Sequence, residues 1–298
     1  MLFQCMFWGL RFDILYTVQE HNFTPVDNSV QRPPIEAMYV RVVTWNLNGI
    51  RAAIRKGLDD FLSSINADIW MFQEVRALPE QLPKEWRFPE GFEAIWHPAQ
   101  KKGYSGVCTV SRENMSEEGR GINARNDPND DEGRLLLTRH GDLLLANTYL
   151  PSGSAREERQ KWKEEWMVDY LEWAKQYVDL ETPVILAGDL NICHTEDDIW
   201  NPAGNKNTSG FLPQEREWFS ALLASGWSDV FREYRGPGKG PYSWWSNRGR
   251  ARAEDKGWRI DYLLANKAAS DRVRHVEIVR EGGLVVSDHA PVVLDIDF

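Results

Sequence analysis

The spacing of apolar residues along the chain predicts a mixture of strands and helices. Apolar residues that are continuous or alternate over about four to eight positions indicate strands, and apolar residues that recur every three or four positions indicate an amphipathic helix. We therefore expect strands over 40–46, 68–73 and 183–188. A hairpin is expected to join 133–138 to 142–149.

The clearest helix lies around five aromatic residues at steps of three or four, namely Trp162, Trp166, Tyr170, Trp173 and Tyr177. Charged residues fill the positions between them, as is typical of a helix with one face on the core. We interpret the aromatic stripe as core packing rather than as a platform on which bases stack. Ser154 is the expected N-cap of this helix.

Two further helices and four C-terminal strands complete the prediction. The helices are expected over 50–65 and 213–223, and the strands over 242–246, 258–265, 273–280 and 290–298. Helices and many strands in one chain indicate sheets that are covered by helices, an α/β fold.

Residues 1–37 differ in pattern from the rest of the chain. The apolar start is interrupted by Arg11 and Asp13, and no small-residue cleavage site follows, which argues against a secretory signal. Residues 22–37 contain three prolines and no periodicity, as a linker would. Because the pattern changes at Met38, we expect one domain over 38–298, preceded by a disordered extension or an upstream start-site artefact.

Composition narrows the class of protein. The chain has 298 residues, of which 42% are hydrophobic and 27% charged, and this excludes disordered, collagen-like and disulfide-rich miniproteins. Cys5, Cys108 and Cys193 are widely spaced, which argues against a zinc site and suits a reducing compartment. No apolar run approaches the ~20 residues of a membrane span. We expect a cytoplasmic protein that does not bind membranes.

Polar residues gather where the predicted strands end, at 45–49 (WNLNG), 73–74 (QE), 147–149 (NTY), 188–191 (GDLN) and 287–289 (SDH). Turn chemistry alone could account for each segment. Together they bring carboxylates, carboxamides, a tyrosine and a histidine to loops that a rigid scaffold would hold. This set predicts a metal site with oxygen ligands beside a histidine.

These motifs resemble the exonuclease III family of abasic-site endonucleases, within the endonuclease/exonuclease/phosphatase superfamily. The matching segments are WNLNGIRAAIRKGL (45–58), IWMFQEVRA (69–77), GYSGV (103–107), NTYLPSGS (147–154), LAGDLNICH (186–194), NPAGNKNTSGFLPQER (201–216), YSWWSNRGRARAEDKGWRIDYLL (242–264) and SDHAPV (287–292). GDLN and SDH are common to the superfamily, whereas the GNK…GFLPQER and WWSN…GWRIDY blocks resemble its DNA-repair branch. Thr208 stands where the family usually has Asn.

The resemblance implies a four-layer α/β sandwich, with two β-sheets packed face to face and helices outside. It also implies a Mg²⁺-dependent DNA repair nuclease, with Mn²⁺ as a possible substitute. Such an enzyme hydrolyses phosphodiesters 5′ of abasic sites and processes DNA 3′ ends as an exonuclease or phosphatase. The implied partner is double-stranded DNA with abasic sites or 3′ blocks, and we expect a monomer that works at the nucleoid.

Two other functions stay open at this point. One is a phosphoesterase of the same fold that acts on RNA ends or on small phosphoesters. The other is a DNA-binding module without catalytic activity. The formal net charge of -10 does not exclude DNA, because physiological salt limits repulsion to about 8 Å and a local basic patch can dominate.

The resemblance also implies the site residues. The expected catalytic residues are Tyr149, Asp189, Asn191, Asp261 and His289, and the expected metal ligands are Asn48, Glu74 and Asp288. The expected DNA contacts are Arg51, Lys56, Tyr104, Asn205, Trp244, Trp258 and Ile260, of which the last three would line a pocket for a flipped abasic sugar.

Side-chain alternation along extended segments agrees with these roles. Asp189 and Asn191 lie two residues apart, so both can point to one face, where the family uses them on the attacking water. Asp288 and His289 are neighbours whose side chains diverge. Asp261, the family's partner for this histidine, is therefore the better candidate to contact His289, and Asp288 is left for the metal.

Residues 1–37 are predicted to be dispensable, because they lack the periodicity of a core element and precede the first motif. A chain that begins at Met38 should keep the melting temperature and the cleavage rate of the full chain. A large fall in either quantity would show that the N-terminal segment packs on the domain.

Overall fold

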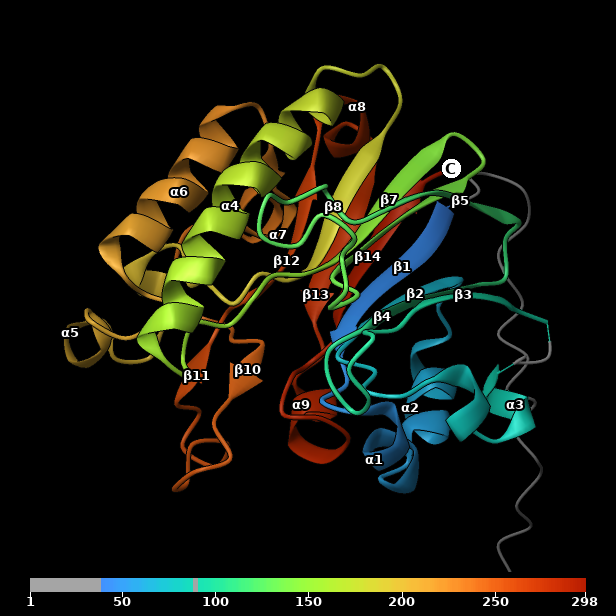
Figure 1. Cartoon of the computed structure of the whole chain (residues 1–298), viewed down its shortest axis with the longest axis horizontal. Coiled ribbons are helices and arrows are strands. Elements are labelled where there is room, and N and C mark those ends of the chain that lie inside the picture. Colours follow the sequence, from blue (N-terminus) through green and yellow to red (C-terminus); the bar gives the residue numbers. More distant parts are fainter. Residues whose placement is uncertain (1–38, 88–90) are drawn as a thin grey trace, which may run out of the picture. The chain divides into compact units, whose positions relative to one another are not determined.

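Two six-stranded sheets face each other at the centre of the computed structural model, which describes residues 39–87 and 91–298 (Figure 1). The expectations for residues 1–37 lie outside the described residues. The first sheet has the order β13 (Val273–Ile278), β14 (Val292–Asp297), β1 (Tyr39–Asn46), β2 (Ile69–Gln73), β4 (Val107–Ser111), β3 (Glu93–His97). The second has the order β5 (Met115–Arg120), β6 (Leu135–His140), β7 (Leu143–Tyr149), β8 (Val184–Asp189), β12 (Asp261–Ala265), β9 (Ser228–Asp229).

Helices cover the outer face of each sheet, which confirms the predicted sandwich. Helices α1 (Ile50–Arg55) and α2 (Leu58–Ile65) pack on the first sheet, and α4 (Glu157–Val178) and α6 (Pro213–Ala224) pack on the second. The described residues also form the short helices α3 (Lys84–Arg87), α5 (Pro202–Asn205), α7 (Val230–Arg235), α8 (Lys267–Ser270) and α9 (Arg280–Val285), with single 3₁₀ turns at Pro79–Gln81 and Glu196–Asp198. In Figure 1, α4 and α6 lie side by side against the second sheet. No helix in the described part of the chain has the length and apolar character needed to cross a membrane.

The two sheets bury a shared apolar core between them. Val42 and Met71 of the first sheet pack with Leu145, Ile185 and Leu263 of the second, and all five side chains are essentially inaccessible. Burial of a large aliphatic side chain contributes about 1.5–3 kcal/mol. The core therefore holds the strand ends of both sheets in fixed positions.

The aromatic stripe of α4 packs on the core, as predicted. Trp166, Tyr170 and Trp173 are buried against the second sheet, and Trp162 and Tyr177 lie partly buried at the two ends of the stripe. The expected N-cap was wrong. Helix α4 begins after Arg156, with no side-chain capping bond, because the hydroxyl of Ser154 instead lies 3.0 Å from that of Ser152.

The helix expected over 50–65 is two helices. Gly57 has φ +90°, a left-handed conformation that ends α1 and starts α2 at a new angle. The hairpin is confirmed, with Gly141 at φ +57° in its turn.

The C-terminal strands are shorter than expected, and a side chain replaces strand hydrogen bonds at one of the breaks. The segment 242–246 forms only β10 (Trp244–Trp245), which pairs with β11 (Gly257–Trp258). Between β11 and β12, the hydroxyl of Ser243 accepts hydrogen bonds from the backbone of Ile260 and Asp261. The sequence patterns also failed to indicate β3, β4, β5 and the two-residue strand β9.

The buried imidazole of His140 should make stability fall in mild acid. It lies 2.9 Å from Thr138 Oγ1 and 3.2 Å from Ser111 Oγ of the facing sheet, and burial lowers its pKa from 6.5 to about 4. Between these values the unfolded chain binds a proton that the folded protein excludes, so the stabilisation present above pH 6.5 is lost as the pH falls to 4.

We predict that this histidine accounts for about 3 kcal/mol of the fall in the free energy of unfolding between pH 6.5 and 4. Urea denaturation of wild type and His140→Gln across this range provides the measurement. Parallel pH profiles for the two proteins would contradict the prediction.

Candidate functional site

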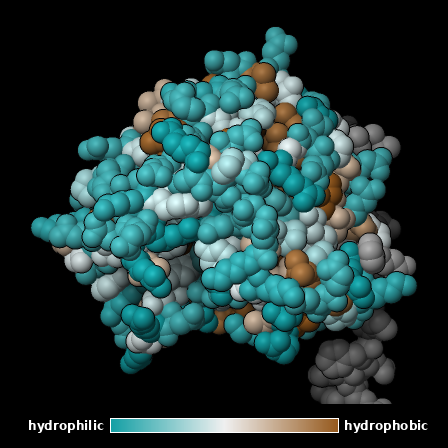
Figure 2. Space-filling view, viewed as in Figure 1, coloured by the Kyte–Doolittle hydropathy of each residue, from teal (hydrophilic) through white to brown (hydrophobic). Residues whose placement is uncertain are grey.

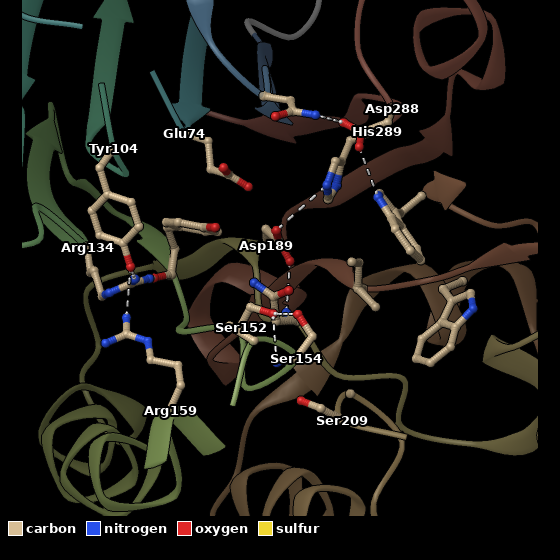
Figure 3. A pocket seen from close by; sticks show the side chains of 18 of the residues that line it. Glu74, Tyr104, Arg134, Ser152, Ser154, Arg159, Asp189, Ser209, Asp288 and His289 are labelled. Carbon is tan, nitrogen blue, oxygen red and sulfur yellow. Dashed lines mark hydrogen bonds and ion pairs between the residues drawn. The ribbon is translucent and has the colours of Figure 1, made fainter. Parts of the chain in front are cut away.

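Strand direction brings the polar segments to one edge of both sheets. β2 runs parallel to β1, and β8 runs parallel to β7, so all four strands end at this edge. β14 and β12 run antiparallel to these neighbours and begin there. Asp261 is consequently the register partner of Asp189, which is itself opposite Tyr149. A cleft of 1040 Å³ opens at this edge (Figure 3).

The backbone at the cleft is held in an unusual conformation. Asn48, Glu74, Arg76 and Asn191 all have φ between +49° and +51°. Asn tolerates this left-handed region, whereas for Glu and Arg it is rare and costs about 1–3 kcal/mol. Such strain persists where the surrounding structure determines the position of the side chain, and it clusters at functional sites.

Asn46, at the end of β1, connects the carboxylates of the two sheets. Its Nδ2 donates to Glu74 Oε1 at 2.9 Å and to Asp189 Oδ2 at 2.8 Å, and its Oδ1 accepts from the backbone N–H of Asn48. Glu74 also pairs with Arg76. One carboxamide therefore sets the separation of two buried carboxylates.

His289 and Asp261 form the buried pair that the sequence predicted. His289 Nδ1 lies 2.9 Å from Asp261 Oδ2, which also accepts a hydrogen bond of 2.6 Å from Ser243 Oγ. The other ring nitrogen points into the cleft, 3.9 Å from Asp189 Oδ2 (Figure 3). Asp288 points elsewhere and accepts from Asn48 Nδ2 at 2.8 Å.

The charges of the buried carboxylates determine the protonation of their neighbours. Burial opposes a charge on His289, but Asp261, Asp189 and Asp288 outweigh it and raise the pKa of His289 to about 10. Burial, with Asp261 and Glu74 nearby, raises the pKa of Asp189 above its ordinary value, against the opposing effect of His289.

Tyr149 keeps its proton, because burial and the charges of Glu74 and Asp189 hold its pKa well above the usual value. Its phenol can therefore donate a hydrogen bond into the cleft. The guanidinium of Arg134 lies 4.8 Å from the centre of its ring.

The acidic residues fit a divalent cation. Ligand atoms of Glu74, Asp189 and His289 lie within 4.8 Å of one another. A charged His289 carries protons on both nitrogens and offers no lone pair, so within this cluster only the carboxylates could ligate a cation. Hard cations such as Mg²⁺ prefer such oxygens. Asn48 and Asp288, the other expected ligands, pair with each other at the rim of the cleft.

Aromatic and apolar residues form one wall of the cleft. Trp244 and Trp258 meet edge to face, with ring centres 5.9 Å apart, and Ile260 is buried beside them. Tyr104 lines the opposite side together with Arg134 (Figure 3).

Three expected DNA contacts lie outside the cleft lining. Arg51 and Lys56 are exposed on and just after α1, and Asn205 donates to the backbone of Asn201. Their contact with DNA stays a prediction. The face shown in Figure 2 is largely hydrophilic, with apolar side chains scattered across it.

Sequence reasoning missed several residues that shape the site. Asn46 and Arg76 lie within motifs that were noticed, but a motif does not say which of its members faces the site. Arg134 is buried directly before the apolar strand β6, and a charged residue next to such a run is a usable signal of a buried partner. Ser243 carries no comparable signal.

Comparison with known proteins shows that the chain belongs to a known family. Residues 43–289 match the model of the Endonuclease/Exonuclease/phosphatase family. The chain is 35% identical over 261 residues to an exodeoxyribonuclease of Bacillus subtilis (strain 168), covering 87% of this chain and 100% of the relative. It is 31% identical over 277 residues to a DNA-(apurinic or apyrimidinic site) endonuclease of Dictyostelium discoideum, covering 91% and 74%.

Solved structures share the architecture. A 3′ phosphatase from Neisseria, bound to a product DNA hairpin, superposes with a TM-score of 0.77 at 25% identity and covers 87% of this chain and 100% of the other. A 3′-5′ exonuclease from Neisseria meningitidis superposes with a TM-score of 0.77 at 26% identity, with the same coverage.

Asn46→Asp should destabilise the protein by at least about 2 kcal/mol at pH 7, because a third carboxylate replaces the donor that Glu74 and Asp189 share. The loss should shrink at pH 5, where a carboxyl of the cluster takes up a proton. Urea unfolding at both pH values measures it. Asn207→Asp, which adds the same charge at an exposed position, is the control. Equal losses for the two variants would refute the role of Asn46.

Proposed function

Because the chain belongs to the endonuclease/exonuclease/phosphatase family and is similar throughout its domain to exodeoxyribonucleases and abasic-site endonucleases, we propose that it is a DNA repair nuclease. It cleaves the phosphodiester 5′ of an abasic site and processes DNA 3′ ends. The observation that carries the proposal is the convergence of Glu74, Asp189 and the Asp261–His289 pair beside an aromatic pocket.

The reaction is hydrolysis at phosphorus. Water adds to the phosphorus, the bond to the 3′ oxygen breaks, and that oxygen takes up a proton. Glu74, with Asn48 and Asp288, would hold a Mg²⁺ or Mn²⁺ ion, which would neutralise charge on the phosphoryl oxygens. Asp189 orients the water, since Asn46 and the backbone N–H of Asn191 fix both of its oxygens.

His289 and Tyr149 stabilise the charge that develops on the phosphoryl oxygens. The imidazolium keeps its proton because Asp261 accepts from the other nitrogen, so Nε2–H faces the cleft as a charged donor. Tyr149 adds a neutral donor. Both groups are buried, where a fixed dipole or charge acts more strongly than it does in water.

The aromatic wall supports a preference for a sugar without a base. Extrusion of an abasic nucleotide avoids the unstacking free energy of a few kcal/mol that a normal nucleotide requires. Trp244, Trp258 and Ile260 give one wall of the cleft an apolar surface against which a bare deoxyribose would pack. Cys108 and Cys193 are buried free thiols, which agrees with work in a reducing compartment such as the cytoplasm.

A panel of end-labelled duplexes tests the function. We expect cleavage of an internal abasic site and removal of a 3′-phosphate with Mg²⁺, and loss of both activities in excess EDTA. RNA ends and soluble phosphoesters serve as the competing substrates. Undiminished cleavage in EDTA would overturn the metal assignment, and faster turnover of RNA or soluble phosphoesters would overturn the substrate.

Trp258→Ala should reduce the preference for an abasic over an intact duplex by about tenfold, because it removes apolar contact with the extruded sugar. Activity on a 3′-phosphate end should fall less. The rates on matched duplexes provide the measurement. Trp200→Ala, at an exposed tryptophan outside the cleft lining, is the control. Unchanged selectivity in Trp258→Ala would show that the aromatic wall does not contribute to recognition of the abasic sugar.

A further inference from the structure

The core-facing stripe of α4 contains a charged residue. Lys163 is as inaccessible as Tyr170 on the same stripe, with 0% of its surface exposed. Its ion-pair partner Glu215, in the first turn of α6, is equally buried. A lone buried charge is strongly unfavourable, and an apolar pair of similar volume is often at least as stable as a buried ion pair. Stability alone therefore does not explain why a lysine and a glutamate stand at these positions.

The ammonium of Lys163 reaches beyond its ion pair to the catalytic loop. Nζ donates to Glu215 Oε1 at 2.5 Å and to the backbone carbonyl of Asn191 at 3.0 Å. No apolar side chain could supply the second hydrogen bond.

That carbonyl belongs to the residue that fixes Asp189. Asn191 has φ +51°, its backbone N–H donates to Asp189 Oδ1 at 2.8 Å, and its Nδ2 donates to Leu150 O at 2.8 Å. Lys163 thus holds the third polar group of this residue. A change in the peptide at Asn191 would turn the carboxylate of Asp189.

Glu215 also holds the loop that lies between the catalytic segment and the wall of the cleft. Its Oε2 accepts from the backbone N–H of Gly210 at 2.6 Å and of Leu212 at 3.0 Å. Gly210 has φ +94°, and an added Cβ would lie 3.1 Å from Asn191 O and 3.2 Å from the ring of Trp258. The loop is therefore fitted between the catalytic segment and the pocket.

We propose that Lys163 and Glu215 are positioning residues that align Asp189 and Asn191 with the pocket wall. The inference rests on the proposed function, because it assigns the pair a task in that reaction. Neither side chain touches the substrate. They act by fixing the position of Asp189 and Asn191, which orient the attacking water. A misplacement of such a group by about 1 Å can reduce a rate on the order of 100-fold.

The double variant Lys163→Met with Glu215→Gln tests the proposal in the full chain. It removes both charges and the bond to Asn191, while the Gln oxygen can still accept from Gly210 and Leu212. The single Lys163→Met leaves Glu215 buried without its positive partner, so the Tm of this variant should fall by about 10 °C. The double variant should recover most of that Tm.

Despite its recovered Tm, the double variant should show a kcat reduced on the order of 100-fold on the abasic duplex, with KM within about threefold of wild type. Amide hydrogen exchange at 189–193 should be faster. Met167→Ala, on the same face of α4 but with a side chain that offers the loop no hydrogen bond, is the control. It should lose Tm while keeping kcat and the exchange pattern below its melting transition.

A double variant with wild-type kcat would overturn the proposal. Recovery of kcat in proportion to the recovery of Tm would also overturn it, because that result is expected if the pair only stabilises the fold. If the double variant does not fold, Lys163→Gln with Glu215→Gln replaces it, because the Gln side chain is one atom too short to reach Asn191, and the same loss of kcat is expected. A wild type that cleaves no DNA would overturn the proposed function, and the exchange measurement would then test the positioning alone.

Discussion

Mutual repulsion among buried carboxylates is the constraint around which this end of the protein is arranged. Glu74, Asp189 and Asp261 are each less than 10% exposed and lie at converging strand ends. Each carboxylate has a specific partner close to it. The partners are the carboxamide of Asn46 in β1, the imidazolium of His289 before β14 and the hydroxyl of Ser243 before β10. In the left-handed backbone conformation, Glu74 contacts its carboxamide partner, and Asn191 donates its backbone N–H to Asp189.

The two-sheet architecture makes this concentration of charge possible. Parallel pairs of strands deliver carboxylates from both sheets to one edge, and the apolar core between the sheets prevents the ends from moving apart. In a less rigid scaffold the repulsion between the carboxylates would push the strand ends apart, whereas here the core keeps the carboxylates close together. The same strained geometry can attract a cation and present a polarised phosphate to water.

Periodicity predicted the elements whose packing is regular. β1, β2, the hairpin and α4 follow the hydrophobic pattern because each buries one continuous face. The pattern failed where single side chains decide the backbone, as at Gly57 and at Ser243, which replaces strand hydrogen bonds. At the site, motifs located Asp189 and His289, but Asn46 was missed, because its importance lies in joining carboxylates that are distant in the sequence.

The hairpin of β10 and β11 carries two of the pocket's aromatic side chains and belongs to neither large sheet. It is linked to the sheet ends through bridges such as Trp244 to His289. The residues proposed for hydrolysis and the two tryptophans proposed for recognition thus come from different pieces of chain. Under the proposed function, a substitution at a hairpin side chain would change the wall that meets the sugar, while the carboxylates stay anchored at the strand ends of the two large sheets.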